Sequence, residues 1–227
     1  MSKEIILDGI CKSYEYDLSQ NFVAAAVKYD RDKNYVTHSG IAICFQRELY
    51  IFHYTGAKVK LELLDPKKWY VENKLDFIKN SEVASFYIYC EDISVEARPE
   101  YGFNYNGSYF LPDGKYYTEV EDYQFMSCVG FCLNVLTGAI ESKCYIDYEQ
   151  WTLADHEKDQ YFLEHMESYL DSIPKEKRQF LKINQRRIFP IDYFTSSFFS
   201  DKPVTKVQID TLKPKVESIL KMKYGVN

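Results

Sequence analysis

The sequence predicts an α+β fold in which a small antiparallel sheet packs against a helix. Three observations favour this class: strand-like segments with short polar connections fill residues 22–64, a short segment after residue 127 has helical periodicity, and the last third of the chain is mostly helical in pattern. At 227 residues the chain is long enough for one sizeable core. We therefore expect a core of residues 1–150 and a helical extension, residues 151–227, packed on the same domain.

Four segments in the first third of the chain are predicted strands, because apolar and β-branched side chains dominate them. They cover residues 22–27, 38–45, 49–54 and 59–64. The tripeptide Gln46-Arg47-Glu48 is short enough to join the second and third segments as a hairpin. Residues at similar distances from a hairpin turn face one another, so His38 and His53 are expected within side-chain reach.

The middle of the chain mixes helix, strand and loop signals. Asp65-Pro66 ends the run of strands, residues 69–78 are expected to form a short helix, and residues 84–90 a further strand rich in Tyr and Phe. Residues 98–123 form a long aromatic and glycine-rich segment, and loops of this length are often functional covers or binding loops. An excursion packed down by its own tyrosines explains the pattern equally well.

A helix is predicted at residues 128–136, ended by Thr137-Gly138. Four residues at three- and four-residue spacing share one of its faces: Cys128, Phe131, Cys132 and Val135. Further helices are predicted in the last third, where apolar residues recur at helical spacing. They cover residues 159–173, 174–187 and 214–224.

Composition and charge narrow the class of protein. A net charge of −6 argues against a non-specific nucleic-acid binder, whose affinity comes largely from Lys and Arg. Apolar residues nowhere run together for the roughly 18 positions that a membrane span needs, and the apolar stretch before Asp8 is too short for a signal peptide. The six cysteines lack the paired close spacing of zinc ribbons and redox motifs, which favours a reducing compartment. We expect a cytoplasmic protein without a cofactor.

Cys128 is the candidate nucleophile. It begins the predicted helix, where unpaired backbone N–H groups and the helix dipole favour a thiolate and help to bind an oxyanion. The structural alternative is a buried cysteine that acts as a small hydrophobe. Cys132 lies one turn later on the same face, and we interpret it as structural.

His38 is the candidate base, and His53 is the group expected to fix the orientation of its ring. A thiol is only a few per cent ionised at neutral pH, so it needs a base and a third group that holds the tautomer of that base. The alternative is that each histidine is a satisfied polar residue in a half-buried sheet. A zinc site from these histidines, Cys128 and Cys132 is a competing interpretation. Zinc sites usually draw ligand pairs from tight loops, which argues against a metal here.

At these residues the chain resembles the papain-like cysteine hydrolases of the NlpC type, in the circularly permuted branch that includes the lecithin retinol acyltransferase-like proteins. Residues 38–43 match the family's His-x-Gly-Ile strand, Phe52-His53 matches the polar position on the following strand, and residues 128–131 are similar to its Cys-Ser-Gly-Phe helix start. The permuted branch also has the histidine hairpin before the cysteine. The likeness lies within residues 22–138, and Val129 stands where Ser is common in the family.

The resemblance implies an antiparallel sheet packed on the helix that carries the nucleophile. It also implies that Cys128 is the nucleophile, His38 the general base and then acid, and His53 the orienting residue. A tyrosine assists the oxyanion in some members of the family. Three tyrosines upstream of the cysteine are candidates for that substrate-binding role: Tyr116, Tyr117 and Tyr123.

We therefore expect a soluble cysteine hydrolase of the peptidase or amidase kind that forms an acyl-enzyme on Cys128 with a peptide, amide or acyl substrate. An acyltransferase or thioesterase would use the same residues, because papain-like folds host all of these reactions. The alternative from another class is a non-catalytic binding protein that uses the aromatic segment 101–125 as its recognition surface.

Overall fold

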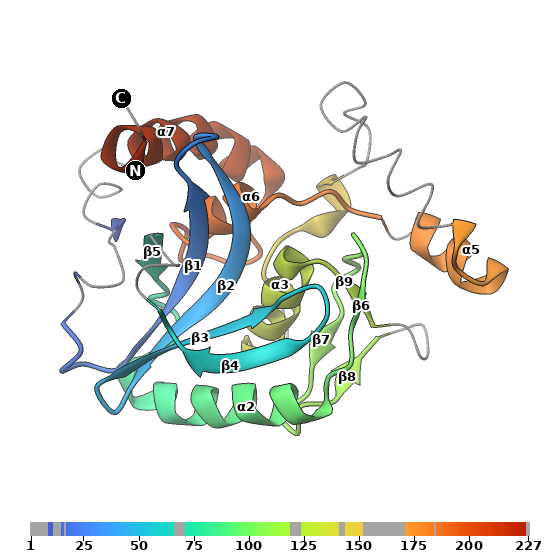
Figure 1. Cartoon of the computed structure of the whole chain (residues 1–227), viewed down its shortest axis with the longest axis horizontal. Coiled ribbons are helices and arrows are strands. Elements are labelled where there is room, and N and C mark those ends of the chain that lie inside the picture. Colours follow the sequence, from blue (N-terminus) through green and yellow to red (C-terminus); the bar gives the residue numbers. More distant parts are fainter. Residues whose placement is uncertain are drawn as a thin grey trace.

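The computed structural model describes residues 9–10, 15, 17–65, 71–118, 124–140, 144–151, 171–183 and 185–225. Its centre is a five-stranded antiparallel sheet with the strand order β4-β3-β2-β1-β5 (Figure 1). These strands are β1 (Phe22–Asp30), β2 (Tyr35–Phe45), β3 (Glu48–Tyr54), β4 (Val59–Leu63) and β5 (Val71–Lys74). The expected α+β class and the antiparallel sheet are confirmed.

The remaining elements are helices and short strand pairs. The helices are α2 (Val83–Glu96), α3 (Cys128–Ala139), α5 (Lys175–Ile183), α6 (Pro190–Ser196) and α7 (Lys206–Tyr224), with 3-10 turns η2 (Asn80–Glu82) and η3 (Tyr148–Gln150). The short strands are β6 (Glu100–Tyr101), paired with β9 (Phe125–Met126), and β7 (Tyr109–Phe110), paired with β8 (Tyr116–Tyr117). Within the described ranges, no helix is long and apolar enough to span a membrane.

Side-chain alternation gives the sheet two faces with different contents. The face that we call the helix face carries large apolar residues, which belong to the main core. They include Val27, Ile41, Ile43, Phe52 and Tyr54. The opposite face, which we call the histidine face, has a floor of very small buried residues on β1 and β2. They are Ala24, Ala26, Gly40 and Ala42.

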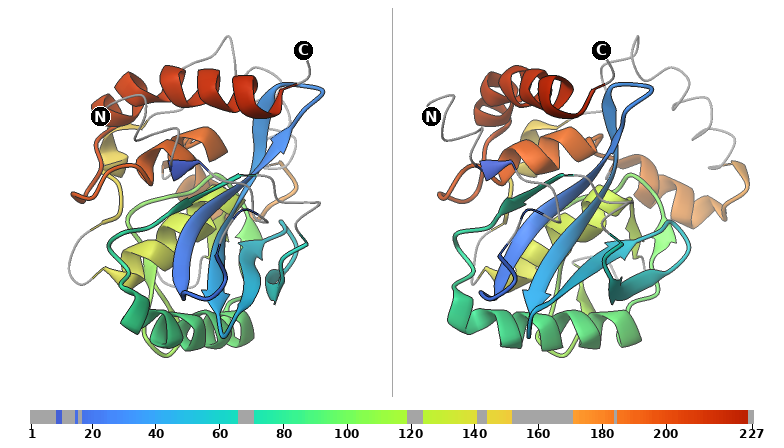
Figure 2. Two further views of the ribbon diagram at one scale, coloured as in Figure 1. Left: turned by 90° about the vertical axis from the view of Figure 1, so that its left-hand side faces the viewer. Right: turned by 60° about the vertical axis from the view of Figure 1, so that its left-hand side comes forward.

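Helices cover the helix face. Phe131 of α3 packs edge-on against Phe52, with ring centroids 5.0 Å apart, and Tyr87 of α2 stacks on Phe45 at 5.1 Å. Tyr193 of α6 donates a hydrogen bond from its hydroxyl to the Gly40 carbonyl at 2.9 Å. In Figure 2, α6 lies between the sheet and α7, so the carboxyl-terminal helices share the main core with the sheet.

A β-bulge interrupts the pairing of β1 with β2. Lys28 lies opposite His38 and Tyr29 lies opposite Val36, so Thr37 is the extra residue on β2. The Thr37 hydroxyl donates to the Lys28 carbonyl at 3.2 Å. His38 is therefore the first residue after the bulge, and its side chain shares the histidine face with Gly40 and Ala42.

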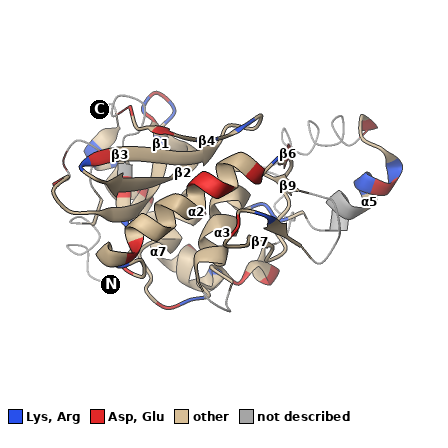
Figure 3. Ribbon diagram, turned by 90° about the horizontal axis from the view of Figure 1, so that it is seen from below, with Lys and Arg blue, Asp and Glu red and all other residues tan. Residues whose placement is uncertain are grey.

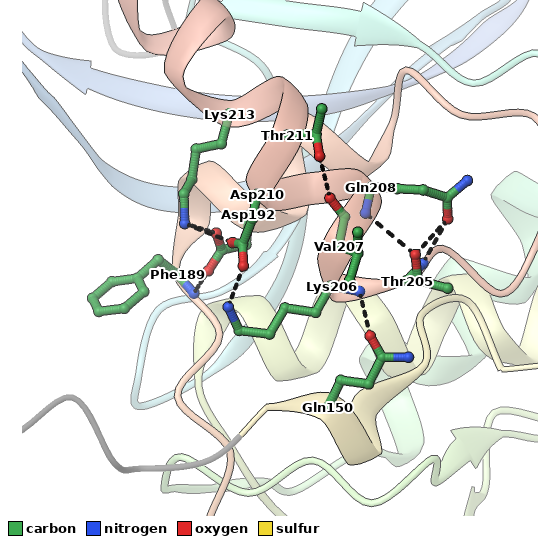
Figure 4. Close-up of polar contacts among 10 residues, drawn as sticks. All are labelled: Gln150, Phe189, Asp192, Thr205, Lys206, Val207, Gln208, Asp210, Thr211 and Lys213. Atoms are coloured by element: carbon green, nitrogen blue, oxygen red, sulfur yellow. Dashed lines mark hydrogen bonds and ion pairs between the residues drawn. The ribbon is translucent and has the colours of Figure 1, made fainter.

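Polar contacts fix the start of α7 to its neighbours (Figure 4). Thr205 is the N-cap, and its hydroxyl accepts from the backbone N–H of Gln208. The buried carboxylate of Asp192 accepts from the Lys213 ammonium at 2.9 Å and from the backbone N–H of Phe189 at 2.9 Å. The prediction that this helix starts at Pro214 was wrong, because the Thr205 cap starts α7 earlier and the proline lies inside it.

Two predictions in the middle of the chain were also wrong. The segment 71–74, expected within a helix, is strand β5, because it pairs with Ala24–Val27 along the free edge of β1. The segment 84–90, expected as a strand, lies in helix α2, whose buried residues Val83, Phe86, Cys90 and Ile93 recur every three or four positions. The predicted helix 159–173 lies largely outside the described residues.

Candidate active site

His38 and His53 lie in contact on the histidine face. The His38 Nε2 is 3.1 Å from the His53 Nδ1, and the rings meet edge to face with centroids 5.4 Å apart. The hairpin register makes this contact, because β2 and β3 pair at Ile41 and Phe52 and the two histidines follow at the same end of the ladder. The predicted proximity of the two side chains is confirmed.

A carboxylate extends this pair across β3 to β4. The His53 Nε2 is 3.4 Å from the Glu62 Oε1, and Lys60 lies 3.2 Å from the other oxygen of the same carboxylate. A carboxylate accepts hydrogen bonds, so His53 donates through Nε2 and presents Nδ1 as an acceptor. His38 then donates to it through Nε2, which leaves the lone pair of the ring on His38 Nδ1. The contacts thus assign Nδ1 as the basic atom of His38.

The surroundings keep both imidazoles neutral. Burial, then the charges of His53 and Lys28, lower the pKa of His38 to about 4. Burial also lowers the pKa of His53, although the Glu62 carboxylate acts in the opposite direction. A neutral imidazole can accept a proton, so His38 has the protonation state that a general base needs at neutral pH.

Cys128 begins α3 as predicted, and its side chain is half-buried. Ser127 is the N-cap, and its hydroxyl accepts from the backbone N–H of Gly130 at 3.1 Å. The first N–H groups of a helix have no acceptor within the helix, so those of residues 128 and 129 are available in principle to an oxyanion. This is the environment in which a cysteine can act as a nucleophile.

Tyr101 is a neighbour of Cys128 that the sequence analysis missed. Burial raises the pKa of Tyr101, negative charge on Cys128 raises it further, and Arg187 lowers it. The Tyr101 residue as a whole is 41% exposed. It reaches this position through the parallel pairing of β6 with β9, the strand that leads into α3. Local sequence pattern gives no sign of such a long-range pairing.

The cysteine and the histidines belong to opposite faces of the sheet. Burial strongly raises the pKa of Cys132, one turn after Cys128, and the nearby Ser39 side chain acts in the opposite direction. Ser39 has the same parity on β2 as Ile41 and Ile43 of the main core, so it faces α3. The side chain of His38, the preceding residue, therefore projects to the other face. The structure brings together two of the three predicted catalytic residues and attaches the third to the helix on the opposite side.

The predicted substrate-binding tyrosines have different environments. Burial raises the pKa of Tyr116 to about 12, while the neighbouring Ser108 and Asn134 side chains act in the opposite direction. Tyr117 is 47% exposed and packs against Tyr109, with ring centroids 4.8 Å apart. Tyr123 lies outside the described residues. Tyr101, rather than Tyr116 or Tyr117, is the tyrosine whose pKa is raised by negative charge on Cys128.

Glu62 was also missed, although the sequence holds a signal for it. Thr55-Gly56-Ala57-Lys58 is a turn between two strand-like runs, so residue 53 pairs with residue 60 and lies diagonal to residue 62. The polar residues of β4 alternate as Lys60 and Glu62 between apolar neighbours. This pattern places both side chains on the face that carries His53.

The described residues contain no group of three or more His, Cys, Asp or Glu side chains that could hold a metal ion. Cysteines 44, 90, 128, 132 and 144 are free, and Cys11 lies outside the described residues. No family model, curated protein or solved structure matches this chain.

Proposed function

We propose that the protein is a cysteine-dependent hydrolase that cleaves an amide or peptide-type bond through an acyl-enzyme on Cys128, on a papain-like fold of the permuted NlpC type. The observation that carries the proposal is the hydrogen-bonded series from His38 through His53 to Glu62, with separations of 3.1 and 3.4 Å. Such a series holds one ring in a single tautomer, which is what a general base requires.

The reaction would use the atoms identified above. His38 Nδ1 takes the thiol proton as the Cys128 sulfur attacks the carbonyl carbon, and the first N–H groups of α3 bind the oxyanion. His38 then gives that proton to the leaving amine as the C–N bond breaks and the acyl-enzyme forms. A water molecule, deprotonated by His38, attacks the acyl carbon, and collapse of the intermediate releases the acid and restores the thiol. An acceptor other than water would make the same site an acyltransferase.

The proposal requires the cysteine to meet His38 at one end of the sheet. The described pairing of β2 with β3 ends at Ile41 and Phe52, so residues 38–40 and 53–54 lie beyond that ladder. Phe131 of α3 lies against Tyr54, with ring centroids 6.2 Å apart, so the start of α3 approaches the same end. Cys128 would therefore meet His38 at the end of the sheet where β2 and β3 are no longer hydrogen-bonded to one another.

The test is the alkylation of Cys128 by iodoacetamide as a function of pH, followed by mass spectrometry of the peptide that carries it. We expect a fast phase of alkylation in the native protein that is lost in His38→Ala, because the variant lacks the base that takes the proton of the thiol. His53→Gln is expected to weaken the phase by a smaller factor, since it disturbs only the orientation of His38. A p-nitrophenyl ester should leave an acyl group on Cys128 in the native protein.

His156→Ala is the matched control, because it removes a histidine that has no role in the proposed reaction. Equal alkylation rates for the native protein and His38→Ala, together with no acyl adduct, would refute the catalytic proposal. Cys132 is an internal reference within the same helix, since burial raises its pKa and its alkylation should be slow in every variant.

A non-catalytic binding protein is the second candidate, and the placement of α3 and the histidines on opposite faces favours it. Its proposed recognition surface, residues 101–125, is largely packed into the core: Phe103, Tyr105, Phe110 and Phe125 are buried. Tyr101 and Tyr117 are the exposed aromatic residues of the described part of that segment. A binding role would therefore depend on these two tyrosines, and Tyr101→Ala with Tyr117→Ala would abolish it without affecting alkylation of Cys128.

A further inference from the structure

A pocket of about 1100 Å³ lies between α2, the carboxyl end of α3 and residues 200–202. Part of its lining is apolar and aromatic and includes Phe77, Phe86, Tyr89 and Ile140. Ligand pockets of drug-sized molecules typically have volumes of roughly 300 to 1000 Å³ and mostly apolar linings. The pocket is therefore large enough to take up most of an organic ligand.

The charges around this pocket are mainly negative. Glu82, Asp92 and Asp201 line it. Helix α2, which forms one wall, carries three acidic residues and no Lys or Arg, as the red segments in Figure 3 indicate. The pocket also adjoins Gly138, Ala139 and Ile140 at the carboxyl end of α3, which is the negative pole of the helix dipole.

Lys202 is the basic residue in the described lining, and its ammonium is bound within the protein. Its Nζ donates to the Phe199 carbonyl at 2.6 Å and lies 4.2 Å from the centre of the Tyr145 ring. Burial lowers the pKa of Lys202 to about 7, although Asp201 acts in the opposite direction. Its charge therefore offsets the three carboxylates only in part.

The pocket is separate from the candidate active site. Cys128 and Ile140 mark opposite ends of α3, and at 1.5 Å per residue they are about 18 Å apart along the helix axis. A ligand in this pocket would not touch the cysteine.

We propose that this pocket binds an organic cation that joins an amine or ammonium head to an alkyl or aryl body. The apolar part of the lining would take the body, and the carboxylates of Glu82, Asp92 and Asp201 would attract the head. Charge complementarity decides between ligands of the same shape, because an anionic head would be repelled by whichever of these carboxylates it approached. The proposal is independent of the proposed hydrolase function.

The test uses three probes with the same eight-carbon chain and different heads: octylamine, octanol and octanoate. Isothermal titration calorimetry of the full chain should give the tightest binding for octylamine, weaker binding for octanol and the weakest for octanoate. Cys128→Ala should bind octylamine as the native protein does, so failure of the hydrolase proposal leaves this result unaffected. Equal affinities for octylamine and octanoate, or tighter binding of octanoate, would overturn the proposal.

Variants locate the binding site. Asp92→Asn and Glu82→Gln keep the shape of each side chain and should each weaken octylamine binding by up to about fivefold while leaving octanol unchanged. Asp32→Asn, in the distant β1–β2 turn, is the matched control and should change neither affinity. Ser85→Trp should block all three probes from the pocket, whereas Val95→Trp, on an exposed part of α2 outside the lining, should not. Unchanged octylamine binding in Ser85→Trp would refute the site.

Discussion

The two faces of the sheet differ in side-chain size and in charge. On the helix face, large residues such as Ile41 and Phe52 pack against α2, α3 and α6. On the histidine face, the centre holds alanine and glycine, and polar side chains form a row that runs from Lys28 through His38 and His53 to Glu62. The same strand, β2, supplies both. The difference teaches that alternate residues of β2 have separate roles. One set packs in the core, and the other set places ionisable groups in a partly buried setting.

The largest effect is expected from a cavity on the helix face. Phe131 is fully buried, with ring contacts to Phe52, Tyr54 and Phe110. Phe131→Ala should lower the free energy of unfolding by about 3–5 kcal/mol, measured by urea denaturation, because the surrounding rings cannot close the space. Ile88→Ala, at a position that is 57% exposed, is the control and should cost little. A loss below about 1 kcal/mol for Phe131→Ala would contradict the division of the two faces.

The second-largest effect is a pH dependence of the free energy of unfolding that comes from His38 on the histidine face. The pKa of His38 is about 4 in the folded state, below the ordinary 6.5, so the folded state binds fewer protons between these values. The free energy of unfolding should therefore be highest above pH 6.5 and should fall as the pH is lowered from 6.5 to about 4. The loss due to this residue is up to about 3 kcal/mol. Urea denaturation at pH 7, 5.5 and 4.5 should show a smaller loss in His38→Gln than in the native protein. Parallel curves for the two proteins would show that the folded state does not lower the pKa of His38.

A third change tests the small residues of the histidine face. Ala26 is fully buried and lies opposite Gly40 on β2 and Glu72 on β5. Ala26→Leu should destabilise the fold by about 1–3 kcal/mol, because the added carbons have no space. Lys28→Leu places the same side chain at an exposed position of the same strand and should have a much smaller effect on the midpoint of unfolding.

The smallest effect is expected at the exposed end of the histidine series. Glu62→Gln removes the charge that raises the pKa of His53, but the Glu62 side chain is 48% exposed, and solvent weakens the interaction. The free energy of unfolding should change by less than about 1 kcal/mol. The pKa of His53, followed by NMR titration of its ring protons, should fall further. A rise in that pKa would contradict the assigned contact.

The sequence predicted much of the fold because its strongest signals are local. The hairpin of β2 and β3 and the helix that starts at Cys128 follow from alternation, turn residues and three- and four-residue spacing. Residues 84–90 were misread because their aromatic side chains are typical of strands, whereas the period of their burial, which extends to Ile93, is helical. Strand β5 depends on pairing with the distant β1, which no local pattern reveals.

The candidate site, like the fold, could be predicted from the sequence only where its contacts depend on local pattern. The contact between His38 and His53 follows from hairpin register alone. Tyr101 is brought toward Cys128 by the long-range pairing of β6 with β9. The side of the sheet on which α3 packs depends on which set of alternate β2 side chains faces the core. Both Ser39 and His38 are polar, so the amino acids themselves do not decide which of them faces the helix.

The bulge at Thr37 uncouples the tip of the β1–β2 hairpin from its base. Val36 faces Tyr29, which packs against Tyr224 of α7, and His38 faces Lys28 on the other side of the sheet. If Thr37 were absent, Val36 and His38 would become successive residues of a regular ladder, and each would keep its present partner and its present face. The hairpin can therefore lose this one residue without turning His38 toward the core.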